Sequence, residues 1–146
     1  MKKFISLSFI VFIIDRLLKI IVQNFLVDKI YIIKNFFYLV FTKNIGAAFS
    51  IMEGMQIVLA LIGLVALGLI FMYVRKNNSK SLGYPLLFGG ILGNIFDRVI
   101  FGYVIDFIGF ELFNYKFPIF NFADMCIVIG AFIVLIGSDK DETRSK

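Results

Sequence analysis

The sequence predicts an all-α integral membrane protein, in which four transmembrane helices carry a small β-sheet on one side of the membrane. Hydrophobic residues make up 60% of its 146 residues, and its mean hydropathy is +0.94. A soluble domain of this length cannot bury so many apolar side chains, because small domains leave much of their surface in water. The segment from Gly54 to Val74 contains no charged residue and is long enough to cross roughly 30 Å of hydrocarbon.

The chain is interpreted as one domain, residues 1–146. The spans are expected at roughly 4–24, 54–74, 82–99 and 121–138. The first span follows Lys2 and Lys3, as a secretory signal would. It runs directly into DRLLK without a small-residue cleavage site, so we expect it to be retained. Charged side chains occur in three of the spans, and a charge near the bilayer centre costs on the order of 3 kcal/mol.

Lysine and arginine are distributed unevenly between the spans. With four spans both termini lie on one side of the membrane, and that side has eight of these residues against four on the other. Cytoplasmic loops carry the excess of positive charge. We therefore expect both termini in the cytoplasm and the segments 28–53 and 101–120 outside. Most of the net charge of +5 follows from this topology, and no basic patch with interleaved aromatic residues predicts nucleic-acid binding.

The two outer segments are rich in β-branched and aromatic residues. The first contains IYIIKNFFYLVF and the second GYVIDFIGFELFNYKFPIF, and both compositions favour strands. We expect these segments, roughly 28–53 and 101–120, to form a small sheet over the outer ends of the helices.

Composition excludes several kinds of catalytic site. The chain has no histidine and one cysteine, Cys126, which excludes Ser-His-Asp triads, histidine zinc sites and internal disulfides. Cys126 lies in an apolar run and is interpreted as a small buried hydrophobe. If the chain is an enzyme, acid–base chemistry by aspartate is the leading option by elimination.

Asp106 and Asp124 are the candidate catalytic residues. Asp106 follows the outer end of the third span and Asp124 begins the fourth, so the predicted topology places both at one membrane face. Asp106 has no local partner in VIDFI. Asp124 has an alternative, structural role, because it follows Asn121 by three residues and can complement the positive end of a helix that Asn121 caps.

Other polar residues in the spans also allow structural explanations. Asp15 and Lys19 are spaced i, i+4 and can form an ion pair on one helix face. Gly90, Asn94 and Asp97 share one face of the third span, where glycine lets another helix approach and polar side chains hold it. The stretch TKNIGAAFS can be a tight loop before a small-residue helix start.

Five motifs in order resemble those of the lipoprotein signal peptidases, the bacterial membrane aspartyl proteases called signal peptidase II. They are DRLLK, TKNIGAAFS, GGILGNIFDR, GYVIDF and FNFAD, and the resemblance covers nearly the whole chain. Phe117 stands where many members have tryptophan before the proline. The resemblance implies a four-helix bundle with a small extracytoplasmic β-cradle, in the bacterial cytoplasmic membrane.

By this resemblance, Asp106 and Asp124 are the catalytic pair of an aspartic endopeptidase. It removes the signal peptide from diacylglyceryl-modified prolipoproteins, cutting just before the lipidated cysteine. The supporting residues that the resemblance implies are Asp15, Lys19, Asn44, Gly90, Asn94, Asp97, Arg98, Asn121 and Ala123. It implies no cofactor and no metal. Besides the substrate, we expect membrane lipid as a partner, and a chain that acts as a monomer.

A pair of neighbouring carboxylates shares one proton, so that one can activate water while the other protonates the scissile carbonyl. We predict that Asp124, near a helix N-terminus, is the base. Asp106, flanked by Ile105 and Phe107, is predicted to keep the proton, because desolvation disfavours its charged form.

Two alternatives use the same residues differently. A small proton- or ion-coupled transporter would use the intramembrane Asp, Asn and Arg side chains as a relay. It requires a polar path through the bilayer, which the uninterrupted second span argues against. In a scaffold the polar residues would only hold the helices together, and replacing Asp106 or Asp124 would impair folding.

Overall fold

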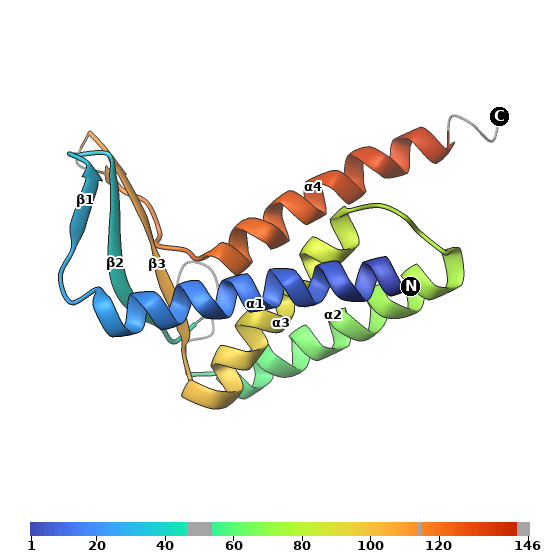
Figure 1. Cartoon of the computed structure of the whole chain (residues 1–146), viewed down its shortest axis with the longest axis horizontal. Helices are drawn as coiled ribbons and strands as arrows, with labels where there is room; N and C mark the ends of the chain where they lie inside the picture. Colours follow the sequence, from blue (N-terminus) through green and yellow to red (C-terminus); the bar gives the residue numbers. More distant parts are fainter. Residues whose placement is uncertain (47–53, 114, 143–146) are drawn as a thin grey trace.

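The computed structural model describes residues 1–46, 54–113 and 115–142. Within these residues the chain forms four helices and one four-stranded antiparallel sheet, which stands at one end of the helices (Figure 1). The helices are α1 (Lys2–Phe25), α2 (Gln56–Asn77), α3 (Gly83–Phe101) and α4 (Phe122–Glu142). The strands are β1 (Ile30–Ile33), β2 (Phe37–Asn44), β3 (Val104–Leu112) and β4 (Tyr115–Lys116). The predicted combination of four helices with a small sheet is therefore confirmed.

The central helix is α3, which packs against α1, α2 and α4. Glycine makes two of these approaches possible. A Cβ atom at Gly89 would lie 2.6 Å from the backbone oxygen of Ser8 in α1, and one at Gly90 would lie 2.5 Å from that of Ala123 in α4. Since both neighbours are backbone atoms, they cannot move aside without moving a helix. These two positions set how closely α3 packs on its neighbours.

The most apolar helix, α2, is also poorly covered by protein. Only 17% of its most apolar stretch is buried, along a stripe that includes Ala60, Leu67 and Val74. Bulky side chains such as Ile57 and Leu69 are exposed. An apolar surface of this extent is unfavourable in water and suits lipid.

By length and composition, α2 and α3 are the two described helices that can cross a membrane, and α4 contains a shorter apolar stretch, Phe122–Gly137. The helix α1 is long enough, at 24 residues, but Asp15, Arg16 and Lys19 interrupt its apolar sequence. The crossing of α1 and α4 therefore stays a prediction.

The charges of α1 lie on its buried face. Buried residues form a stripe from Phe4 to Val22 along the helix, and Asp15, Arg16 and Lys19 belong to it. The neighbours of α1 include α3 and α4, and the charges point into the protein. They do not face the surroundings of the bundle.

The sheet is anchored on the C-terminal end of α1. Its strand order is β1-β2-β3-β4, and the register of β2 on β3 pairs Thr42 with Asp106. Ile105 and Phe107 of β3 form an apolar cluster with Val22 of α1. The residues on both sides of Asp106 are thus held by packing, which limits the movement of Asp106 itself.

The segment before α4 returns to β3. The amides of Phe107 and Ile108 both donate to the carbonyl oxygen of Phe120, at 3.0 and 2.8 Å, and the amide of Phe120 donates to the carbonyl oxygen of Ile108 at 3.0 Å. This pairing holds the first turn of α4 beside the middle of β3, where Asp106 lies.

Candidate active site

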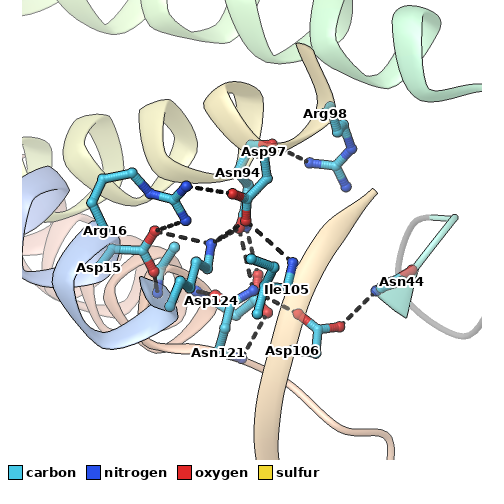
Figure 2. A network of polar contacts seen from close by, with 12 residues as sticks. Asp15, Arg16, Asn44, Asn94, Asp97, Arg98, Ile105, Asp106, Asn121 and Asp124 are labelled. Atoms are coloured by element: carbon cyan, nitrogen blue, oxygen red, sulfur yellow. Dashed lines mark hydrogen bonds and ion pairs between the residues drawn. The ribbon is translucent and has the colours of Figure 1, made fainter. Parts of the chain in front are cut away.

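Asp106 lies in β3 and belongs to a polar network where the helices meet the sheet (Figure 2). Its side chain is 2% exposed. One carboxylate oxygen accepts a hydrogen bond from Asn44 Nδ2 at 2.8 Å, and the other accepts one from Asn121 Nδ2 at 2.6 Å. Burial, followed by the charge of Asp124, raises the pKa of Asp106 to about 7. A carboxyl group of this kind is poised to hold or release a proton near neutral pH.

Asp124 and Asn121 form a reciprocal cap at the start of α4. The amide of Asp124 donates to Asn121 Oδ1 at 2.9 Å, and Asp124 Oδ2 accepts from the amide of Asn121 at 3.2 Å. This is the capping-box arrangement, which satisfies two otherwise unpaired helix amides. The structural role predicted for Asp124 is therefore present. It leaves Oδ1 of Asp124 facing the network, where it accepts from Asn94 Nδ2 at 2.7 Å.

Two asparagine side chains connect Asp106 to Asp124. Asn121 Nδ2 donates to Asp106, and it also donates to Asn94 Oδ1 at 3.3 Å. Asn94 in turn donates to Asp124. One route joins the two carboxyl groups through Asn121 alone, whose backbone amide donates to Asp124, and the other passes through Asn121 and then Asn94. The two carboxyl groups are 18 positions apart in the sequence. Asp106 is buried whereas Asp124 is half-buried, so Asp124 is the more accessible of the two carboxyl groups.

Lys19 supplies a positive charge to the network that joins Asp106 and Asp124. It is fully buried, and its ammonium group lies 2.9 Å from Asp15 Oδ2, 2.8 Å from Asp97 Oδ2 and 3.1 Å from Asn94 Oδ1. Three acceptors saturate the three protons of the group. The ion pair between Asp15 and Lys19 is present as a structural feature, and through Asn94 it also contacts the carboxylate network.

Asp15 and Asp97 each hold a backbone amide next to the candidate catalytic residues. Asp15 Oδ1 accepts from the amide of Ala123 at 3.1 Å. Asp97 Oδ2 accepts from the amide of Ile105 at 3.2 Å. Because Ala123 precedes Asp124 and Ile105 precedes Asp106, each buried acid positions the backbone of one candidate residue.

Arg16 is a member of the network that sequence reasoning missed. Its Nη1 lies 2.6 Å from Asp97 Oδ1, and its guanidinium group lies over the ring of Phe96, 4.9 Å from the centroid. A signal was available, because Arg16 is a charge within an expected span, directly after Asp15. Helical periodicity places neighbours on different faces, and this hid the fact that both side chains reach the buried side.

Asn44 and Arg98 lie at the margin of the network. Asn44 Oδ1 accepts from the amide of Gly46 at 2.9 Å, which turns the end of β2 and aims Nδ2 at Asp106. Arg98 donates to the carbonyl oxygen of Asn94 at 3.2 Å and to that of Gly46 at 3.4 Å. The rest of TKNIGAAFS, from Ala47 onwards, lies outside the described residues, as does any helix start there.

The structure brings all the candidate residues to one place. Asp106, Asp124, Asn44, Asn94, Asn121, Asp15, Lys19 and Asp97 form one connected network, with Arg98 bound to the backbone of Asn94. Gly90 contributes by lacking a side chain, since a Cβ there would meet the backbone oxygen of Ala123. Among the described residues no group of three His, Cys, Asp or Glu side chains is placed to hold a metal ion.

The fold is shared with solved structures of membrane enzymes. One of them is described as "Bacterial membrane enzyme structure by the in meso method at 2.3 A resolution"; it has a TM-score of 0.88 at 32% identity, over 100% of this chain and 93% of that chain. A second, described in the same words at 1.9 A resolution, has a TM-score of 0.83 at 33% identity, over 97% of this chain and 95% of that chain. With its exposed apolar helices, the chain is an integral membrane protein of this enzyme fold.

The family described as Signal peptidase (SPase) II matches residues 7–139, and the chain belongs to this family. A lipoprotein signal peptidase of Staphylococcus carnosus is 37% identical over 142 residues, covering 93% of this chain and 89% of the relative. A lipoprotein signal peptidase of Clostridium acetobutylicum is 40% identical over 140 residues, covering 88% of this chain and 91% of the relative. The resemblance carried by the five motifs is confirmed, and the chain is a peptidase of this family.

Proposed function

We propose that this peptidase is an aspartic endopeptidase that removes signal peptides from diacylglyceryl-modified prolipoproteins, cutting just before the lipidated cysteine. The observation that carries the mechanism is the joining of Asp106 and Asp124 through Asn121 and Asn94. The names of the relatives in two bacteria, both lipoprotein signal peptidases, support the substrate class.

In this mechanism Asp124, ionised, takes a proton from a water molecule as its oxygen attacks the scissile carbonyl carbon. Asp106, protonated, donates its proton to the carbonyl oxygen. Collapse of the tetrahedral intermediate returns that proton to Asp106, and the proton held by Asp124 passes to the leaving amine. The carboxyl groups end in their starting states, and neither forms a covalent bond to the substrate.

The assignment of the two roles follows from the surroundings of each carboxyl group. Asp106 is buried in β3, and burial raises its pKa to about 7, so about half of the molecules hold this proton at pH 7 and more of them below it. Asp124 is half-buried at the start of α4 and accepts hydrogen bonds on both oxygens. A helix N-terminus and hydrogen-bond donors both stabilise a negative carboxylate.

We place the protein in the bacterial cytoplasmic membrane, with both termini in the cytoplasm and the sheet outside. The distribution of lysine and arginine supports this orientation. It puts Asp106 and Asp124 at the outer face, where a lipidated cysteine rests at the bilayer surface and water is available. The chain is proposed to act as a monomer, with membrane lipid around α2.

A cleavage assay with purified chain in detergent and a diacylglyceryl-modified prolipoprotein tests the proposal. Asp106→Asn and Asp124→Asn are each expected to lower kcat by roughly 10²- to 10⁴-fold, the contribution of positioned acid–base groups. Asp28→Asn removes an exposed carboxylate outside the network and is expected to keep full activity. Helicity and thermal melting of each variant report on folding.

Three outcomes would contradict the proposal. Undiminished activity of either network variant would exclude the paired mechanism. Loss of folding in both, with no separable loss of activity, would favour the scaffold. A well-folded wild type that cleaves no lipidated precursor would favour the transporter alternative.

A further inference from the structure

A cavity of about 260 Å³ lies at the end of the helices opposite the sheet. It is formed where the start of α1 meets the turn between α2 and α3, near the N-terminus in Figure 1. The candidate active site lies at the other end of the bundle, so the cavity is separate from it. No residue of the carboxylate network lines it.

Four of the residues that line the cavity are lysines or serines. Lys3 and Lys80 line it, both are exposed, and neither forms an ion pair within the described part of the chain. Ser79 and Ser81 line it as well. Each serine oxygen accepts a backbone hydrogen bond, at 3.4 and 3.3 Å, which leaves its own hydroxyl proton free to be donated. Two ammonium groups and two hydroxyl donors form a suitable environment for an anionic oxygen.

Other residues that line the cavity are apolar. Phe4, Leu7, Leu82 and Pro85 line it. Leu82 is 51% exposed, so it also belongs to the apolar outer surface of the protein. A soluble anion would gain nothing from these apolar side chains, whereas the glycerol and the first part of an acyl chain would pack on them.

The position of the cavity along the helices corresponds to the depth of the lipid head groups in a bilayer. The 22 residues of α2 span roughly 33 Å at 1.5 Å per residue, close to the thickness of the hydrocarbon core. The cavity lies at the C-terminal end of α2 and therefore at one surface of the bilayer. Anionic head groups attract basic residues at that depth.

We propose that this cavity binds one anionic phospholipid, with its phosphate held by Lys3, Lys80 and the serine hydroxyls and its apolar part against Phe4 and Leu82. The lipid joins the first turn of α1 to the α2–α3 turn. Because it binds the folded chain, occupancy raises the melting temperature. This inference requires the membrane setting of the proposed function but not its peptidase chemistry.

Thermal melting of delipidated full-length chain in neutral detergent tests the site, with short-chain phosphatidylglycerol as the probe. Phosphatidylglycerol is expected to raise the melting temperature in a saturable manner, and phosphatidylcholine and inorganic phosphate are not. In the double variant Lys3→Gln/Lys80→Gln, the apparent Kd is expected to weaken by on the order of tenfold or more, from the loss of two cations near an anionic lipid.

The matched control is Lys2→Gln/Lys76→Gln, which removes the same charge from exposed positions at the same end of the bundle that do not line the cavity. The apparent Kd of this control for phosphatidylglycerol is expected to stay within about twofold of wild type. Because all four lysine positions are exposed, both double variants are expected to melt like wild type in the absence of lipid. Asp106→Asn is expected to bind phosphatidylglycerol normally, which separates this test from the peptidase assay.

If both double variants bind phosphatidylglycerol equally weakly, the lipid is attracted by the general positive charge at this end of the bundle and not by the cavity. An equal shift with phosphatidylcholine would remove the anionic specificity. A shift with inorganic phosphate alone would show a small-anion site. Each of these results would overturn the proposal.

Discussion

Asp106 illustrates how burial changes the chemistry of one side chain. It lies between Ile105 and Phe107, which pack on α1, and it is 2% exposed. Water therefore cannot solvate its charge, and the pKa rises from 3.8 to about 7. The hydrogen bonds from Asn44 and Asn121 favour the ionised form and oppose this rise without cancelling it.

This shift predicts a pH-dependent stability. Below pH 3.8 Asp106 is protonated in both the folded and the unfolded chain, and between 3.8 and about 7 the folded chain alone keeps the proton. The free energy of unfolding contributed by Asp106 therefore falls as pH rises through this window, by at most about 1.4 kcal/mol per pH unit. Denaturation of wild type and Asp106→Asn across pH 4 to 8 is expected to show this slope in wild type only. Parallel curves for the two chains would disprove the assignment.

Arg16 influences the position of Asp106 indirectly, through its ion pair with Asp97. It pairs with Asp97 at 2.6 Å, and the second oxygen of Asp97 holds the amide of Ile105, beside Asp106. Arg16 is 8% exposed. Removing one partner from a buried ion pair leaves an uncompensated charge, which is strongly destabilising.

We expect Arg16→Gln to lower the free energy of unfolding by about 3 kcal/mol, the low end for breaking a buried pair, since Lys19 still contacts Asp97. Arg16→Lys is expected to restore only part of this, because an ammonium group lacks the planar fork and the stacking on Phe96. Arg75→Gln, at an exposed position of α2, is the control and is expected to change stability by less than about 0.5 kcal/mol. Equal effects of Arg16→Gln and Arg75→Gln on chemical denaturation would contradict this role.

At the scale of elements, the first turn of α4 has two roles, because the residues that cap the helix also belong to the candidate active site. Its cap consists of Asn121 and Asp124, and the amide of Ala123 in its first turn is held by Asp15. The pairing of Phe120 with Ile108 fixes this turn on β3. The geometry of the carboxyl pair therefore depends on how closely α4 packs on α3 and β3.

Gly90→Ala tests this dependence. Its Cβ would lie 2.5 Å from the carbonyl oxygen of Ala123, so α4 must move away from α3. We expect a loss of about 1–3 kcal/mol in stability, as for other overpacked interiors, together with a lower kcat. Gly68→Ala in α2 is the matched control, because nothing lies within 4 Å of its Cβ position; it is expected to gain about 0.5–1 kcal/mol. If both variants melt above wild type, the close contact at Gly90 does not matter.

At the scale of the whole molecule, the bundle has charged residues inside and large apolar residues on its surface, the reverse of a water-soluble protein. Asp15, Lys19 and Asp97 are fully buried, whereas Leu61, Val65 and many other large apolar residues are exposed. In water this arrangement would expose apolar surface. In a bilayer the lipid covers that surface, and the buried charges neutralise one another away from hydrocarbon.

The proposed orientation predicts which positions an impermeant reagent reaches. In a Cys126→Ser background, Lys116→Cys on β4 is expected to react with an impermeant maleimide on intact bacteria. Lys76→Cys at the end of α2 is expected to react only after the membrane is opened. Both positions are exposed, so a difference in labelling between them reports the side of the membrane on which each lies and not its burial in the protein. Labelling of both positions in intact cells, or of Lys76→Cys alone, would refute the orientation.

The membrane class, the presence of four helices with a small sheet, and the family were all predictable from the sequence. These depend on local properties. Hydropathy and its length decide whether a segment suits lipid, β-branched and aromatic runs favour strands, and motifs in order identify a family. The spacing of Asp15 and Lys19, and of Asn121 and Asp124, also predicted contacts that the structure contains, because one helical turn places both partners together.

The connections between distant residues were decided only by the tertiary structure. The bridging of Asp106 to Asp124 by Asn121 requires Phe120 to pair with β3, and the role of Arg16 requires α1 to pack on α3 so that the guanidinium group meets Asp97. Which oxygen meets which donor depends on helix separations set by glycine contacts such as that of Gly90. Sequence patterns describe the faces of single elements. They do not contain the distances between elements, which result from the packing of all of them at once.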